Sequence, residues 1–212
     1  MIDSNFIKNS KFITQNVSRE TLDELNKYSL SILRKNKDIN LISTSSEKSI
    51  NTRHIIDSAQ IIDFIDKNEK KCTDIGSGSG LPGIVLAIIA KHKNIQMQFD
   101  LYEKSFKKSQ FLNHVVKKFN LKAKILQKDI FQEKNLFTDL IVARAFKPLP
   151  IILKLANSNF KKFKSLILFL GRNDKNLIKE SLKEWSFEYK EKKSITSEES
   201  LIVKIWNLKK NV

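Results

Sequence analysis

The chain has 212 residues, of which 41% are hydrophobic, and its formal net charge at pH 7 is +16. This length and composition fit one globular domain with a modest extension. The longest apolar run, residues 84–90, is too short to span a membrane, and the polar first residues lack the pattern of a signal peptide. The single cysteine, Cys72, excludes an internal disulfide, so we expect a cytosolic protein that does not bind membranes.

Lysine supplies most of the positive charge, because only five of the 39 basic residues are arginine. A genome biased toward A and T explains part of this excess. The margin over acidic residues nevertheless favours a polyanionic partner with a phosphate backbone. Since arginines are few, bidentate recognition of bases is not the obvious mode of binding.

Two kinds of hydrophobic pattern follow one another along the chain. Residues 1–68 predict a helical extension, with apolar stripes at Leu22, Leu25, Leu30 and Leu33 and at Ile55, Ile56, Ala59, Ile62 and Ile65. Residues 69–212 predict a Rossmann-like α/β domain in which helices separate the early strands. The expected sheet is seven-stranded and mostly parallel, and it ends in an antiparallel hairpin. We expect its strands at residues 71–75, 97–103, 123–128, 139–144, 165–170, 187–192 and 201–208.

A glycine-rich turn follows the first predicted strand and precedes an apolar helix. Four of the five glycines of the chain lie in residues 73–83, and a strand, a glycine turn and a helix in this order are typical of nucleotide-binding α/β proteins. Leu81 stands where the dinucleotide fingerprint needs its third glycine, which occurs one residue early at Gly80. Asp74, two residues before Gly76, disfavours a pyrophosphate and suits a cationic ligand. The pattern, which includes Gly78, resembles motif I of the class I S-adenosylmethionine-dependent methyltransferases.

Polar side chains also end the next three strands. Glu103 is a candidate acceptor for ribose hydroxyls, and Asp129 with Ile130 is a candidate adenine site. Arg144 ends the fourth strand, where it suits a cofactor carboxylate, a substrate phosphate or a guanine; a structural salt bridge is the alternative. We expect its loss to impair activity more than folding.

His54 and Asp57 lie three residues apart, on one face of a predicted helix. We favour a hydrogen-bonded anchor between the N-terminal helices and the sheet over acid–base catalysis. The chain has no cluster of histidine and cysteine with metal-ligand spacing, so we expect no metal.

From about residue 40 to residue 204 the chain resembles the bacterial 16S ribosomal RNA guanine-N7 methyltransferases, the glucose-inhibited division protein B family. Residues 40–43 are similar to the family's N-L-T segment, and residues 53–58 to its R-H-x-x-D-S. Residues 74–83 are similar to D-x-G-[ST]-G-x-G-[FL]-P-G, and residues 144–145 to the R-A pair after its fourth strand. The family's Arg-x-Glu near the third strand and its Lys-Gly after the fifth are absent.

We expect the protein to be a monomer, and the resemblance implies methylation of guanine N7 in 16S ribosomal RNA or the small ribosomal subunit. It implies S-adenosylmethionine as cofactor, with contacts at Gly76, Leu81, Asp129, Ile130 and Arg144. We add Asp74, Gly78, Gly80 and Glu103 to the cofactor site, and we assign Arg144 to catalysis. We expect the RNA to contact Arg53, Lys147 and Arg172.

Other functions remain open on the sequence. One is methylation of another RNA or, less in keeping with the basic charge, of a small molecule. Another is a non-catalytic RNA-binding factor for ribosome assembly, which the intact glycine turn disfavours. An NAD-dependent oxidoreductase is the weakest alternative, because of Leu81.

Overall fold

The structure, a computed structural model, describes residues 17–171 and 175–211. Its α-helices are α2 (Arg19–Asn36), α3 (Thr44–Glu47), α4 (Asp57–Ala59), α5 (Gly83–His92), α6 (Phe106–Lys118), α7 (Leu149–Asn159) and α8 (Lys175–Ser181). A π-helical segment (Asn51–Ile56) precedes α4, and 3₁₀ segments span Gln60–Phe64 and Ile130–Gln132. Its strands are β1 (Lys71–Ile75), β2 (Gln98–Tyr102), β3 (Ala123–Leu126), β4 (Leu136–Phe137), β5 (Leu140–Arg144), β6 (Phe160–Lys162), β7 (Ser165–Leu170), β8 (Trp185–Lys193) and β9 (Leu201–Lys210).

The main sheet confirms the predicted architecture. Its seven strands lie in the order β3-β2-β1-β5-β7-β9-β8. The strands from β3 to β7 pair in parallel, whereas β9 pairs antiparallel with both β7 and β8. The strand order reverses between β1 and β5, and ligands of such sheets bind beside this switch at the carboxyl ends of the strands.

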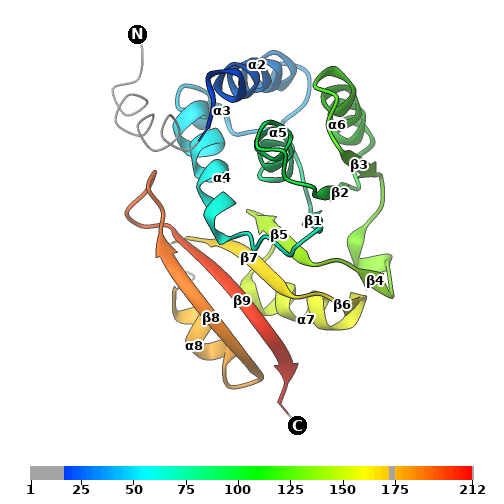
Figure 1. Cartoon of the computed structure of the whole chain (residues 1–212). Helices are drawn as coiled ribbons and strands as arrows, with labels where there is room; N and C mark the ends of the chain where they lie inside the picture. Colours follow the sequence, from blue (N-terminus) through cyan, green and yellow to red (C-terminus); the bar gives the residue numbers. More distant parts are fainter. Residues whose placement is uncertain (1–16, 172–174, 212) are drawn as a thin grey trace.

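Helices cover both faces of this sheet (Figure 1). One hydrophobic cluster joins the sheet to α2, α5 and α6, and a second joins its other face to α7 and α8. Every residue of α5 from Gly83 to Ala90 is buried, which explains the continuous apolar run in the sequence. Strand β5 lies between the two clusters, because Leu140 and Val142 enter the first while Ile141 and Ala143 enter the second.

The N-terminal helices share the first cluster with the sheet. In α2 the fully buried side chains are Tyr28 and Ile32, and Leu25 is buried beside them. The predicted apolar stripe was wrong at Leu30, whose side chain is 51% exposed. The buried face of α2 includes Thr21 and Ser29, so hydrophobicity alone misplaced it.

A second, two-stranded sheet was not predicted. Strands β4 and β6 pair in parallel beside the main sheet. The strands have two and three residues, so they are too short to show an alternation of apolar and polar residues in the sequence. Among the described helices, none has both the length and the apolar composition needed to cross a membrane.

Candidate functional site

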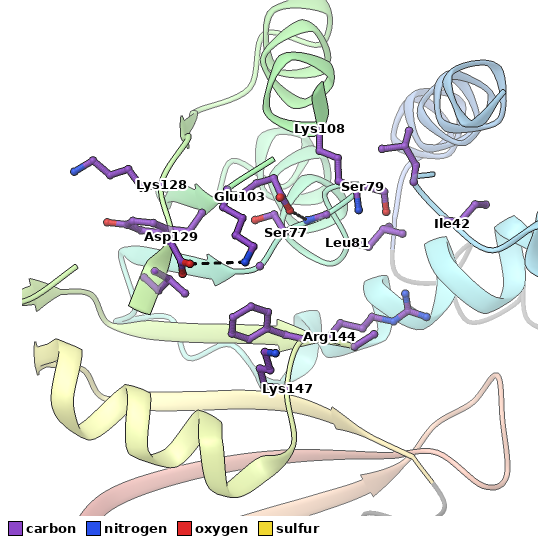
Figure 2. A pocket seen from close by; sticks show the side chains of 18 of the residues that line it. Ile42, Ser77, Ser79, Leu81, Glu103, Lys108, Lys128, Asp129, Arg144 and Lys147 are labelled. Atoms are coloured by element: carbon purple, nitrogen blue, oxygen red, sulfur yellow. Dashed lines mark hydrogen bonds and ion pairs between the residues drawn. The ribbon is translucent and has the colours of Figure 1, made fainter. Parts of the chain in front are cut away.

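A cavity of about 440 Å³ opens at the carboxyl ends of β1, β2 and β5 and beside the turn after β3. Figure 2 shows Ser77, Ser79 and Glu103 on one side of it and Arg144 and Lys147 on the other. Of the predicted site residues, those that line the cavity are Gly76, Gly78, Leu81, Glu103, Asp129, Ile130, Arg144 and Lys147. Asp74, Gly80 and Arg53 are not among its lining residues, and Arg172 lies outside the described residues.

The glycines of the turn serve different purposes. Gly76, Gly78 and Gly80 all have positive φ, between 57° and 92°, which L side chains rarely adopt. A β-carbon at Gly80 would lie 2.5 Å from Ile84 Cγ1 and 2.7 Å from Tyr28 Oη, so this glycine is required by packing. At Gly78 the nearest atom to such a carbon is the Gly76 carbonyl oxygen at 3.8 Å. Gly78 therefore presents open backbone to the cavity.

Glu103 holds the turn in register with the end of β2. Its Oε2 accepts a hydrogen bond from the Gly78 N–H at 2.8 Å, and its Oε1 accepts one from the Ser105 N–H at 2.7 Å. The residue is 8% exposed and lines the cavity. Because a carboxylate has about four acceptor positions, each oxygen keeps a free one for a ligand hydroxyl.

Asp74 fixes the base of the turn from beneath. Its Oδ2 accepts a hydrogen bond from the Gly83 N–H at 2.9 Å, whereas its Oδ1 is buried with no partner among the described residues. Burial raises the pKa of Asp74 to about 7. We therefore interpret Asp74 as a support for the glycine turn, in place of the direct ligand contact expected from the sequence.

The raised pKa of Asp74 predicts a loss of stability as pH rises. The folded state holds the proton more tightly than the unfolded state, so the stabilisation is complete below pH 3.8 and is lost as pH rises to about 7. Between pH 5 and pH 8 the loss should be about 3 kcal/mol. Asp74→Asn should remove this part of the pH dependence, which urea unfolding at each pH would measure. An unchanged pH dependence in the variant would contradict the prediction.

Helix α2 supports the turn through Tyr28, a residue that sequence reasoning missed. The Tyr28 hydroxyl donates to the Ser79 carbonyl oxygen at 2.6 Å, and its side chain is fully buried. Tyr28→Phe keeps the ring but leaves a buried carbonyl without this donor. We expect a loss of about 1–3 kcal/mol in the free energy of unfolding. Urea titration would measure it, and Tyr189→Phe on the exposed face of β8 is the matched control.

The turn after β3 forms the wall beside Glu103. Asp129 Oδ1 accepts from the Phe131 N–H at 3.1 Å, and Ile130 is buried at the cavity. The ring of Phe131 stacks on that of Phe146, with centroids 5.8 Å apart. Phe146 also packs on Gly76, where a β-carbon would lie 2.1 Å from its ring. These two aromatic residues were missed, because each is isolated in the sequence.

Arg144 is held by a network of contacts at the end of β5. Its Nε and Nη2 both lie 3.1 Å from Asp57 Oδ2, Nη1 lies 3.0 Å from His54 Nδ1, and Nη2 donates to the Arg53 carbonyl oxygen. The guanidinium also lies over the Phe169 ring, 5.7 Å from its centroid. The salt bridge that the sequence left as an alternative is therefore present.

The same network confirms the predicted anchor between the N-terminal helices and the sheet. Asp57 joins Arg144 of β5 to the turn between β8 and β9, since its Oδ1 accepts from Ser194 and Thr196, each at 2.8 Å. Gln60 donates to the same oxygen at 2.8 Å. His54 and Asp57 do not bond to each other directly but meet through Arg144.

Positive charge surrounds the cavity. Its lining includes Lys104, Lys108, Lys128, Arg144 and Lys147. Lys104 and Lys128 form ion pairs, but within residues 17–171 and 175–211 the ammonium groups of Lys108 and Lys147 have no partner. Figure 2 shows these two side chains approaching the cavity from opposite sides.

Comparisons with known proteins agree with this geometry. The protein-family model described as rRNA small subunit methyltransferase G matches residues 21–203. The chain is 46% identical over 198 residues to the ribosomal RNA small subunit methyltransferase G of Pelagibacter ubique. This alignment covers 92% of this chain and 93% of that protein. It is 34% identical to the protein of the same name from Rickettsia africae, over 92% of this chain and 98% of that protein.

Solved structures share the fold at low sequence identity. The 16S rRNA methylase RmtB superposes with a TM-score of 0.55 at 15% identity, covering 92% of this chain and 76% of that one. The Aquifex aeolicus tRNA (m1A58) methyltransferase TrmI gives a TM-score of 0.54 at 14% identity, over 73% of this chain and 69% of that one. At these identities the likeness extends to the fold alone.

Proposed function

Because this chain belongs to the rRNA small subunit methyltransferase G family, we propose that it transfers a methyl group from S-adenosylmethionine to guanine N7 in small-subunit ribosomal RNA. The observation that carries the proposal is the cavity built by the glycine turn, Glu103 and the turn after β3 at the switch point of the sheet. We place this activity in the cytoplasm, where bacterial ribosomes are made, and we propose that the enzyme is a monomer.

The residues present fit the cofactor. A volume of about 440 Å³ is in the range of small-molecule sites, and the open backbone at Gly78 lets a ligand approach the turn closely. The free acceptor positions of Glu103 suit the two ribose hydroxyls. Asp129 and Ile130, one strand further along the sheet, would hold the adenine, with Phe131 beside them.

The bound cofactor supplies an electrophilic methyl group on a sulfonium. The chain needs no general base, since guanine N7 has a free lone pair and no proton. The residues around the cavity would act by holding the nucleophile in line with the methyl group and by excluding water. Arg144 fits the role of a fixed donor: its hydrogen bonds to Asp57, His54 and Arg53 use three of the five N–H groups of a guanidinium, and Nη1 keeps a second N–H.

The RNA would bind across the mouth of the cavity. The unpaired ammonium groups of Lys108 and Lys147 favour phosphate contacts on both sides of the cavity, and Arg53 is exposed nearby on the π-helical segment that carries His54. We retain Arg172 as a candidate from its place in the sequence. Such contacts position a backbone without reading its sequence, so the choice of guanine must come from the shape of the RNA and of the cavity.

Methyl transfer to defined RNAs tests this function. Purified protein is incubated with labelled S-adenosylmethionine and either small ribosomal subunits or naked ribosomal RNA from cells that lack the activity. We expect label in the RNA and, after reduction and aniline treatment, cleavage at one guanosine. Comparison of subunits with naked RNA identifies the substrate.

Two other outcomes would overturn the proposal in different ways. Label in a different RNA class would retain the methyltransferase and change its substrate. No label on any RNA, with cofactor binding retained in a calorimetric titration, would favour a non-catalytic assembly factor.

A further inference from the structure

A directional chain of hydrogen bonds runs from the end of β5 to one wall of the cavity. His54 Nδ1 lies 3.0 Å from Arg144 Nη1, and His54 Nε2 lies 2.8 Å from Ser46 Oγ. Because a guanidinium only donates, Nδ1 must be the unprotonated acceptor. Nε2 then carries the single proton of the neutral ring and donates it to Ser46.

Ser46 connects His54 to the cavity wall, because its hydroxyl bonds to His54 and to Ser43. Its hydroxyl donates to the Ser43 carbonyl oxygen at 2.8 Å and accepts from the Ser43 hydroxyl at 3.0 Å. The donation from His54 therefore takes the second acceptor position of a side chain that is 4% exposed. The one donor and two acceptor positions of the Ser46 hydroxyl are therefore all used by these three hydrogen bonds.

The segment held in this way lines the cavity. Leu41, Ile42 and Ser43 belong to the lining of the cavity. Asn36 Oδ1 accepts from the N–H groups of Leu41 and Ile42 at 2.8 and 3.0 Å, which fixes the start of the segment to α2. Ser46 fixes its other end, and the contact with His54 links that end to Arg144 of β5.

We propose that His54 is a positioning residue, which orients the cavity wall at residues 41–43 relative to Arg144 through one fixed tautomer. The proposal rests on the proposed function in one respect only, which is the identity of the ligand that contacts this wall. The ring is held neutral, because burial and then the charges of Arg144 and Arg53 lower the pKa of His54 to about 4. The Asp57 carboxylate contacts the guanidinium of Arg144.

Three replacements of His54 separate the two halves of the chain of hydrogen bonds. His54→Gln extends an amide toward Ser46, His54→Asn presents an amide oxygen to Arg144 without that reach, and His54→Ala provides neither group. Binding of S-adenosylhomocysteine is measured by calorimetry. We expect His54→Ala and Ser46→Ala each to weaken binding about three- to tenfold, the effect of one hydrogen bond. We expect His54→Gln to bind more tightly than His54→Asn.

The coupling between His54 and Ser46 is the sharper test. In the double variant His54→Ala with Ser46→Ala, binding should be no weaker than in the weaker single variant, because both changes break the same chain. Losses that multiply, or wild-type binding by Ser46→Ala, would overturn the proposal. Ser186→Ala, an exposed serine on β8, is the matched control.

A readout without ligand distinguishes failure of this proposal from failure of the proposed function. Long-range ¹⁵N–¹H NMR of the unliganded protein reports the tautomer of each of its three histidines, and the signal that His54→Gln removes identifies His54. We expect the proton on Nε2. A proton on Nδ1 would overturn the proposal even if the protein methylates RNA. The expected tautomer in a protein that binds no cofactor would instead reject the proposed function.

Discussion

Gly78→Val should weaken binding of S-adenosylmethionine by about a hundredfold or more, the effect of about 3 kcal/mol of steric overlap. The physical reason is the direction of the missing side chain. Apart from its two chain neighbours, the nearest atom of the described residues to a β-carbon at Gly78 lies 3.8 Å away, so the added methyl groups would occupy the space of the ligand. The φ of 57° adds strain to the turn, which a β-branched residue tolerates poorly. Calorimetric titration with the cofactor measures the loss.

Gly80→Ala is the contrasting variant for this experiment. Its β-carbon would overlap Ile84 and Tyr28, so we expect a large loss of folding stability. Gly78→Ala adds one carbon in open space and should fold, at a cost of about 1–2 kcal/mol for positive φ. If Gly78→Val does not fold, the calorimetric titration with Gly78→Ala tests whether the cofactor approaches this turn. Wild-type affinity in a folded Gly78 variant would show that the ligand does not approach this turn.

Arg144→Ala should lower the free energy of unfolding by about 3–5 kcal/mol, because it leaves the Asp57 carboxylate buried without its cation. This revises the sequence-based expectation that the change would affect activity far more than folding. Side-chain exposures of 16% for Arg144 and 10% for Asp57 place the pair largely out of water. Urea unfolding gives the stability, and cofactor titration at a temperature where the variant is folded gives the effect on the site.

The Arg53→Ala variant is a suitable control for Arg144. It removes an exposed guanidinium from a neighbouring residue while the Arg53 carbonyl oxygen still accepts from Arg144. A double-mutant cycle with Asp57→Ala tests the cause: the double variant should be more stable than the sum of the two single losses predicts. Additive losses would show that the pair does not couple the N-terminal helices to β5.

The pattern of the chain was sufficient for most of the fold. The buried strands, the apolar helix α5 and the glycine turn between them have strong periodicities or rare residues, and each lies within a few residues of its predicted place. Leu30 and the β4–β6 pair were the failures. In both cases the signal is weak, since α2 buries polar residues and the short strands have no period to detect.

The candidate site divides in a similar way. The sequence by itself determined which strand ends meet at the cavity, because the carboxyl ends of parallel strands adjacent in a sheet lie together. Only the tertiary structure decided what each side chain does there. It bonded Asp74 to the N–H of Gly83, engaged Arg144 with Asp57 and His54, and brought Tyr28 from a distant helix to the turn. These roles depend on contacts between residues as many as 90 positions apart, and no local pattern encodes them.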